Sequence, residues 1–172
     1  MTQDEFKVLC AAIVAAYPRS NPFVSKETTT IWWKFLNDID YKVASLALDE
    51  WIATQPYAPS ISDIRKKKAK IETGEFMNES EAWDMVYKAI CRSSCYADED
   101  FNSFPPEIQR AVGSPNALRQ MGLDENFNNA VESSNFKRAY RNACEQAKQS
   151  AQIPDRVKLM VGAVKQLEGV ET

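Results

Sequence analysis

The sequence predicts an all-α protein, and three observations support this fold class. Only five glycines occur among 172 residues, which is too few for a turn-dense β fold. Apolar residues recur at helical spacing along most of the chain. Capping residues and prolines divide this pattern into segments, and none of them reads as a convincing strand. We therefore expect a compact N-terminal four-helix unit followed by a second helical region of four to five helices.

Four helices are expected in residues 1–74. Thr2 and Glu5 have the spacing of a capping box, which places the first helix directly after Thr2. Pro18 ends that helix, and Gly74 is a natural stop for the fourth. The caps expected for the other helices are Ser25 for the second, Asp40 for the third and Ser60 for the fourth.

The second helical region is expected in residues 75–172, so that the chain divides into domains 1–74 and 75–172. Residues 96–104, with the sequence YADEDFNSF, are interpreted as a loop inside this region. The expected helices begin near Asn78, at Pro105, at Ser114, between Asn129 and Ser133, and at Pro154.

An aromatic-rich stretch in residues 30–52 raises the question of what its large side chains contact. Helical wheels place most of them on arcs that face a core. Trp33 lies well off the centre of its arc, so it either packs against the second region or contacts a partner. The side chains expected in the core are Trp32, Phe35, Leu36, Leu46 and Trp51.

The composition argues against an enzyme. The chain has no histidine, which removes the commonest general base and the commonest zinc ligand. It also has no P-loop motif, so we expect no ATP-dependent loader of the AAA+ kind, no catalytic residue and no cofactor. The formal net charge of −3 creates no overall attraction to DNA, and any contact with nucleic acid would need a local basic patch.

The cysteines indicate a cytoplasmic protein without a metal site. Cys10, Cys91, Cys95 and Cys144 lack C-x-x-C spacing and are interpreted as reduced thiols. Cys91 and Cys95 stand one helical turn apart, but a tetrahedral zinc site needs four ligands and no histidine can complete one. No signal peptide and no membrane-spanning apolar run is recognised, so we expect the cytoplasm, that of the bacterial host if a phage encodes the chain.

A series of short motifs follows the N-terminal helices. An apolar helix ends in Tyr17-Pro18, and a helix with Trp32-Trp33 comes next. The pattern L-x-D-x-x-Y then spans residues 36–41, and S-x-x-D-I-R spans residues 60–65. This order resembles the N-terminal domain of phage-encoded replicative-helicase loader/inhibitor proteins. The segments EAWDMVYKAI, FNSFPPEIQRAVGSPNALRQMG and NFKRAYRNACE are similar to extended versions in phage replication modules.

The resemblance implies a non-enzymatic adaptor of phage DNA replication. Such a protein binds a hexameric replicative helicase, inhibits it, and delivers it to an origin-binding initiator or to single-stranded DNA. In this family the helical N-terminal unit is a stable module and C-terminal sequence contacts the helicase. The alternative from the residues alone is a DNA-binding replication or regulatory protein that uses basic helix faces.

An apolar stripe on the last helix is the first candidate for a partner contact, with Trp33 as an additional one. An amphipathic helix near a terminus can place its apolar face in a groove of a partner. The alternative is that this face closes the domain of the chain itself. The stripe consists of Val157, Met160, Val161, Val164 and Leu167.

Two basic helix faces are candidates for contact with nucleic acid or an acidic partner. One lies in the RKKKAK segment and the other on the long C-terminal helix, and each is alternatively a solvated surface. The first face consists of Lys66, Lys67 and Lys70, and the second of Lys137, Arg138, Arg141 and Lys148.

Overall fold

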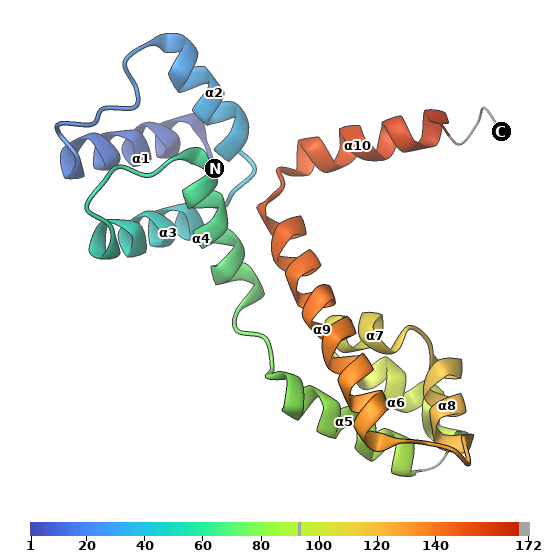
Figure 1. Ribbon diagram of the computed structural model, residues 1–172. Coiled ribbons are helices and arrows are strands. Elements are labelled where there is room, and N and C mark those ends of the chain that lie inside the picture. The colour runs from blue at the N-terminus through green and yellow to red at the C-terminus, as the bar shows by residue number, and fades with distance from the viewer. Residues whose placement is uncertain (93, 169–172) are drawn as a thin grey trace. The chain divides into compact units, whose positions relative to one another are not determined.

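The computed structural model describes residues 1–92 and 94–168, and every regular element in these ranges is a helix (Figure 1). Side chains are described through residue 164, apart from those of residues 93 and 94. Within the described residues there are ten α-helices, one short 3-10 helix and no strand. The all-α prediction is therefore confirmed.

The chain forms two compact units. The first consists of Met1–Gly74 together with the described residues from Lys148 onward, and the second of Glu75–Ala147. The sequence instead predicts a single domain for all of residues 75–172. Because proximity in space does not test which parts fold independently, the division into domains 1–74 and 75–172 stays a prediction.

The N-terminal helices of the first unit start where their caps predict. Thr2 and Glu5 form the capping box, with the Glu5 amide donating to Thr2 Oγ1 at 3.3 Å. Ser25, Asp40 and Ser60 each accept a backbone hydrogen bond at the start of the following helix. The helices of this unit are α1 (Gln3–Ala16), α2 (Lys26–Leu36), α3 (Tyr41–Thr54), α4 (Ile61–Thr73) and α10 (Asp155–Glu168).

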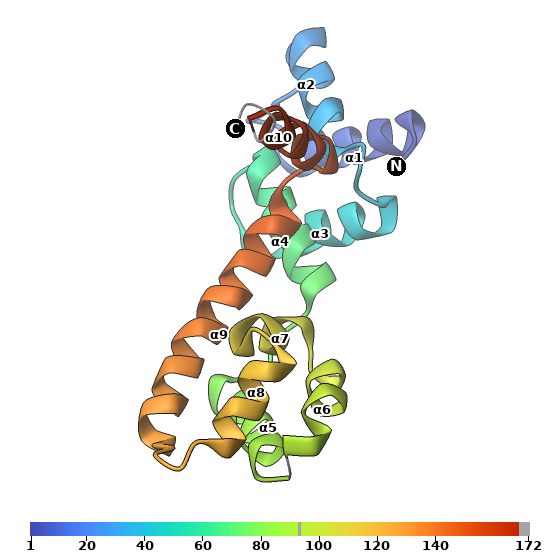
Figure 2. The same cartoon turned by 90° about the vertical axis from the view of Figure 1, so that its right-hand side faces the viewer.

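The core of the first unit lies among α1, α2, α3 and α4, which Figure 2 shows grouped together. Trp32, Leu36 and Trp51 are buried, as predicted, and Phe35 is partly buried. The prediction for Leu46 is wrong, because this side chain is 54 % exposed. The buried positions of α3 are Ala44, Ala47, Leu48 and Trp51.

The error at Leu46 has a geometric cause. Position 46 lies about 200° around the helix from position 44, on the side away from the core. The core-facing arc includes the small residues Ala44 and Ala47, which carry a weaker hydropathy signal than leucine. The prediction from hydropathy therefore selected Leu46, the larger side chain, although it lies on the side of the helix away from the core.

The second unit packs its helices around a separate aromatic core. Trp83 and Phe136 are both buried, and their ring centroids are 5.4 Å apart. The buried Tyr140 donates its hydroxyl hydrogen to the carbonyl of Met77 at 2.9 Å. The helices are α5 (Glu79–Arg92), α6 (Ala97–Ser103), α7 (Pro106–Val112), α8 (Pro115–Leu123) and α9 (Asn129–Gln152), of which α9 passes into the first unit at Lys148.

Residues 96–104 are not the loop that the sequence suggests. A 3-10 helix, η1 (Ser94–Tyr96), leads directly into α6. Asp98, Glu99 and Asp100 occupy the first turn of α6, where negative charge is favoured by the helix dipole. Asp100 also accepts a hydrogen bond from Arg92 at 2.8 Å. The acidic run is therefore a helix start.

Among the described residues, none of the helices combines the length and the apolar character that crossing a membrane requires.

Candidate partner-binding surfaces

The last helix, α10, presents an apolar face to solvent. Its first turn begins at Pro154, whose carbonyl accepts from the amides of Val157 and Lys158. Val157 is partly buried, whereas Met160 is 60 % exposed and Val164 is 53 % exposed. Of the other predicted partner contacts, Val161 is 50 % exposed and Leu167 lies outside the residues whose side chains are described.

Leu159 is an exposed apolar residue that the sequence did not single out. It is 75 % exposed, the highest value among the large apolar side chains of α10 that the structure describes. Position 159 lies off the stripe on the helical wheel, so periodicity gave no reason to group it with Met160 and Val164. One feature of the sequence could have identified it: a leucine stands on the side of the helix where an amphipathic helix would have a polar residue.

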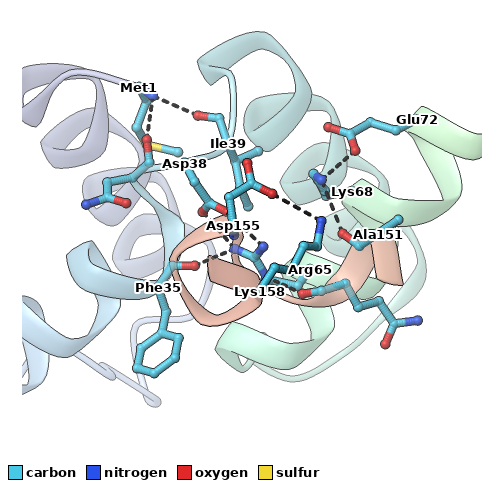
Figure 3. A network of polar contacts seen from close by, with 12 residues as sticks. Met1, Phe35, Asp38, Ile39, Arg65, Lys68, Glu72, Ala151, Asp155 and Lys158 are labelled. Carbon is cyan, nitrogen blue, oxygen red and sulfur yellow. Dashed lines mark hydrogen bonds and ion pairs between the residues drawn. The ribbon is translucent and has the colours of Figure 1, made fainter. Parts of the chain in front are cut away.

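Arg65 is buried and holds the turn between α9 and α10 against the first unit (Figure 3). Its Nη1 and Nη2 donate to the two carboxylate oxygens of Asp38 at 2.8 and 2.9 Å. Its Nη1 also donates to the carbonyl of Phe35, and its Nε to the carbonyl of Gln152. The amide of Asp155 donates to Asp38 Oδ2 at 3.3 Å.

Further contacts surround this ion pair. Lys68 Nζ donates to the carbonyl of Ala151 at 3.2 Å and forms an ion pair with Glu72. The guanidinium of Arg156 lies 5.8 Å from the centroid of the Phe35 ring, within the range of a cation–π contact. The start of α10 is thus fixed by several contacts, while the apolar face further along the helix stays exposed.

The acid–base properties of Asp38 follow from this environment. Burial is the largest single influence on the carboxyl and raises its pKa, but the hydrogen bonds and positive charge of Arg65, together with backbone hydrogen bonds that include the Asp155 amide, outweigh burial. The pKa of Asp38 therefore lies below its ordinary value in the folded protein. A carboxyl with a lowered folded-state pKa stabilises the fold above the pKa of the unfolded chain.

We expect acid to remove this stabilisation. The free energy of unfolding should fall as the pH drops below about 3.9, the ordinary aspartate value, and through the lower folded-state pKa of Asp38. Urea unfolding at several pH values checks this expectation. The variant Asp38→Asn should show a shallower acid dependence than the unchanged protein, and equal slopes would contradict the assignment.

Trp33, the other predicted partner contact, is partly buried against its own unit. Its ring centroid lies 5.4 Å from that of Phe6, so α1 covers one side of the indole. The remaining surface of Trp33 borders an open groove of about 700 Å³ between α1 and α2. Phe23 and Val24 also line the groove, and Val24 is 84 % exposed. The ring is thus packed on residues of the first unit, and its contact with a partner stays a prediction.

The basic face of α4 is smaller than the charge count of RKKKAK suggests. The alternative of DNA binding relied on the segment from Arg65 to Lys70. Arg65, however, is buried and unavailable to a ligand. Lys67 forms an ion pair with Glu50 at 2.5 Å, and only Lys66 and Lys70 of the predicted residues are exposed. This arrangement weakens the case for a phosphate-binding face on α4.

The predicted basic residues of α9 also have acidic or polar neighbours. Arg141 makes two hydrogen bonds to the carboxylate of Glu79, at 2.9 and 3.0 Å. Lys137 donates to Ser80 Oγ, and Arg138 to the side chain of Asn135. Lys148, the remaining predicted residue, belongs to the first unit.

The four cysteines do not gather at one site. Cys91 and Cys95 are exposed in the second unit, where Cys144 is buried, and Cys10 is partly buried in the first. Burial raises the pKa of the Cys10 thiol to about 11, so it stays protonated near neutral pH. Within the described part of the chain, no group of three or more cysteine, aspartate or glutamate side chains is placed to hold a metal ion.

Comparison with known protein families finds a match for the first part of the chain. The family model for the N-terminal domain of the phage gene 39 protein matches residues 1–65, which comprise α1, α2, α3 and the beginning of α4. No curated protein and no solved structure gives a significant match. The resemblance to the phage helicase loader/inhibitor family is thus confirmed for this part of the chain, and it relates the protein to phage helicase-associated proteins of DNA replication.

Proposed function

We propose, on the premise that residues 1–65 are a helicase-associated family domain, that the protein is a non-enzymatic adaptor of phage DNA replication. In this role it binds a hexameric replicative helicase and inhibits it, loads it, or does both. ATP hydrolysis in the cycle then belongs to the helicase. An origin-binding initiator is the expected second partner, because loading requires a destination for the helicase.

The observation that carries this proposal is the exposed apolar face of α10. Met160, Val161 and Val164 are each at least half exposed on one side of a short helix. Fully burying an apolar side chain of this size is worth about 1.5–3 kcal/mol, so a groove that covers these three gains several kcal/mol before the cost of ordering. This surface suits the mode in which a helix lays its apolar face into a partner's groove.

Placing negative charge on the stripe gives a direct test. We expect the double variant Met160→Asp/Val164→Asp to lose co-elution with the purified hexameric helicase and to lose suppression of its ATPase activity. Both side chains are exposed, so the substitutions leave the core of the first unit intact. The control is Leu159→Asp, which adds one aspartate to the same helix at an exposed position off the stripe, against two in the double variant.

The outcomes separate the possible roles of α10. Binding that is lost in both the double variant and the control indicates a general effect of charge on the helix and counts against the stripe. If neither the double variant nor the control changes binding, the α10 contact is refuted. If the unchanged protein does not co-elute with any hexameric helicase, the adaptor role itself is refuted.

DNA binding is the second candidate, and its remaining support on α4 is the exposed pair Lys66 and Lys70. Phosphate contacts would make that binding strongly salt-dependent, with affinity falling as salt rises. Tight, salt-sensitive binding to DNA by the protein alone would favour this function over the adaptor role.

A further inference from the structure

Two motif residues that the sequence does not connect with each other meet in the structure. Asp38 is the aspartate of L-x-D-x-x-Y, and Arg65 is the arginine of S-x-x-D-I-R. They lie 27 positions apart in the sequence and form a two-point ion pair between the turn that follows α2 and the first half of α4. Arg65 is 4 % exposed, and the Asp38 side chain is 17 % exposed, so water reaches the carboxylate more easily than the guanidinium.

The pair has hydrogen-bonding capacity beyond its own two contacts. The Nε of Arg65 is a donor that the carboxylate does not use, and it reaches the carbonyl of Gln152 at the end of α9. Asp38 Oδ2 has a further acceptor position, and it receives the amide of Asp155 at 3.3 Å. The ion pair therefore offers one donor and one acceptor to two main-chain groups of the same turn.

We propose that the Asp38–Arg65 pair is a latch for the turn between α9 and α10. By binding main-chain groups on both sides of residues 153 and 154, it fixes the point at which α10 begins. The contact of Lys68 with the Ala151 carbonyl lies beside it (Figure 3). Arg156 also contacts the Phe35 ring. The latch thereby couples the helical order of α10 to the folded first unit.

The need for such a latch follows from the properties of α10. The helix has 14 residues, a length at which an isolated helix is marginal in water because its first turn is costly to form. Most helices overcome this cost by burying an apolar face, but Leu159, Met160 and Val164 are exposed. The order of α10 must then come mainly from its anchored first turn, and the latch supplies that anchor.

Position 155 allows the latch to be opened from the side of α10, with Asp38 and Arg65 both kept. The hydrogen bond from the Lys158 amide to the Pro154 carbonyl makes Pro154 the N-cap and Asp155 the first helical residue. Proline is well tolerated at this position, since its missing N–H is not part of the helix. Asp155→Pro therefore replaces the N–H that donates to Asp38 with a ring carbon, while the backbone of the helix start accepts proline.

The matched control is Asp155→Ala. Both variants lose the aspartate side chain and its ion pair with Lys158, which is 3.1 Å long. Only the proline variant also loses the N–H donor and turns a ring carbon toward Asp38, so the difference between the two reports the loss of the main-chain contact between residue 155 and Asp38. A hydrogen bond to a charged group is strong enough to change an opening equilibrium by about tenfold or more.

Hydrogen exchange of the full-length protein alone, without any helicase, provides the measurement. We expect the amides of residues 157–164 to exchange about tenfold faster in Asp155→Pro than in Asp155→Ala, while those of α1, α2 and α3 stay unchanged. Asp38→Asn should also accelerate exchange in residues 157–164. Equal exchange of these amides in the proline and alanine variants would overturn the latch, whatever the outcome of the helicase experiment.

Discussion

Replacing Arg65 with methionine is expected to destabilise the first unit by about 3–5 kcal/mol, the usual cost of removing one partner from a buried ion pair. Methionine keeps much of the side-chain length but donates no hydrogen bond. The Asp38 carboxylate, 17 % exposed, would lose both contacts to the guanidinium, and the carbonyls of Phe35 and Gln152 would lose their donor. Few single substitutions at a charged residue have so large an effect.

Urea unfolding followed by tryptophan fluorescence measures this effect, since three of the four tryptophans lie in residues 30–52 of the first unit. The control is Lys66→Met, which makes the same kind of change at the adjacent exposed position and should alter stability by no more than about 0.5 kcal/mol. A loss below about 1 kcal/mol for Arg65→Met would show that the pair contributes little beyond a hydrophobic replacement.

Lysine at position 65 distinguishes charge from geometry. Arg65→Lys keeps the positive charge, but an ammonium group cannot form the two parallel bonds to Asp38 while also reaching Gln152. We expect the stability of this variant, in the same urea experiment, to fall between that of the unchanged protein and that of Arg65→Met. The intermediate value would assign part of the stabilisation to the planar shape of the guanidinium, whereas stability equal to that of the unchanged protein would assign all of it to charge.

The helix starts of the first unit were predictable because their signals are local. Thr2, Ser25, Asp40 and Ser60 each cap the helix that begins at the next residue, so a short window of sequence contains both the cap and the groups it satisfies. The apolar face of α10 was visible for a similar reason, since its spacing follows the helical period.

The contacts that place α10 were not predictable from the sequence. Arg65 lies 87 positions from Gln152, and nothing in the RKKKAK segment shows that Arg65 is the buried cation and that Lys66 and Lys70 are exposed. Arginine is expected at the surface because burial of a charge is rare without a partner. Only the fold brings Asp38 to the position where it makes that burial possible.

The short helix α6 was also not predicted from the sequence. The run of three acidic residues that begins at Asp98 looks like a solvated loop, but in the structure it forms the first turn of α6. The signal was present in the acidic residues before the apolar Phe101, which packs against the core of the second unit. A helix of seven residues offers too few turns for periodicity to reveal it.

In the second unit, Phe136→Ala is expected to lower the free energy of unfolding by about 3–5 kcal/mol, the usual range for removing a buried aromatic ring. Phe136 is 4 % exposed and lies between two other aromatic side chains. Its ring centroid is 5.4 Å from that of Trp83 and 5.8 Å from that of Tyr140, on which it stacks. Alanine would leave a cavity that both neighbours border, and the helices that carry them limit how far it can close.

Hydrogen exchange resolved by segment is the right measurement for this variant, because it separates the two units within one chain. Amides of α5, α7 and α8 should exchange faster in Phe136→Ala, whereas Val131→Ala, at a 51 % exposed position of the same helix, should leave them almost unchanged. If the amides of α1, α2 and α3 keep their protection, the units unfold separately, as the predicted boundary after Gly74 requires. Equal acceleration in both units would mean that the chain unfolds as one cooperative body, and the predicted division into domains would then be wrong.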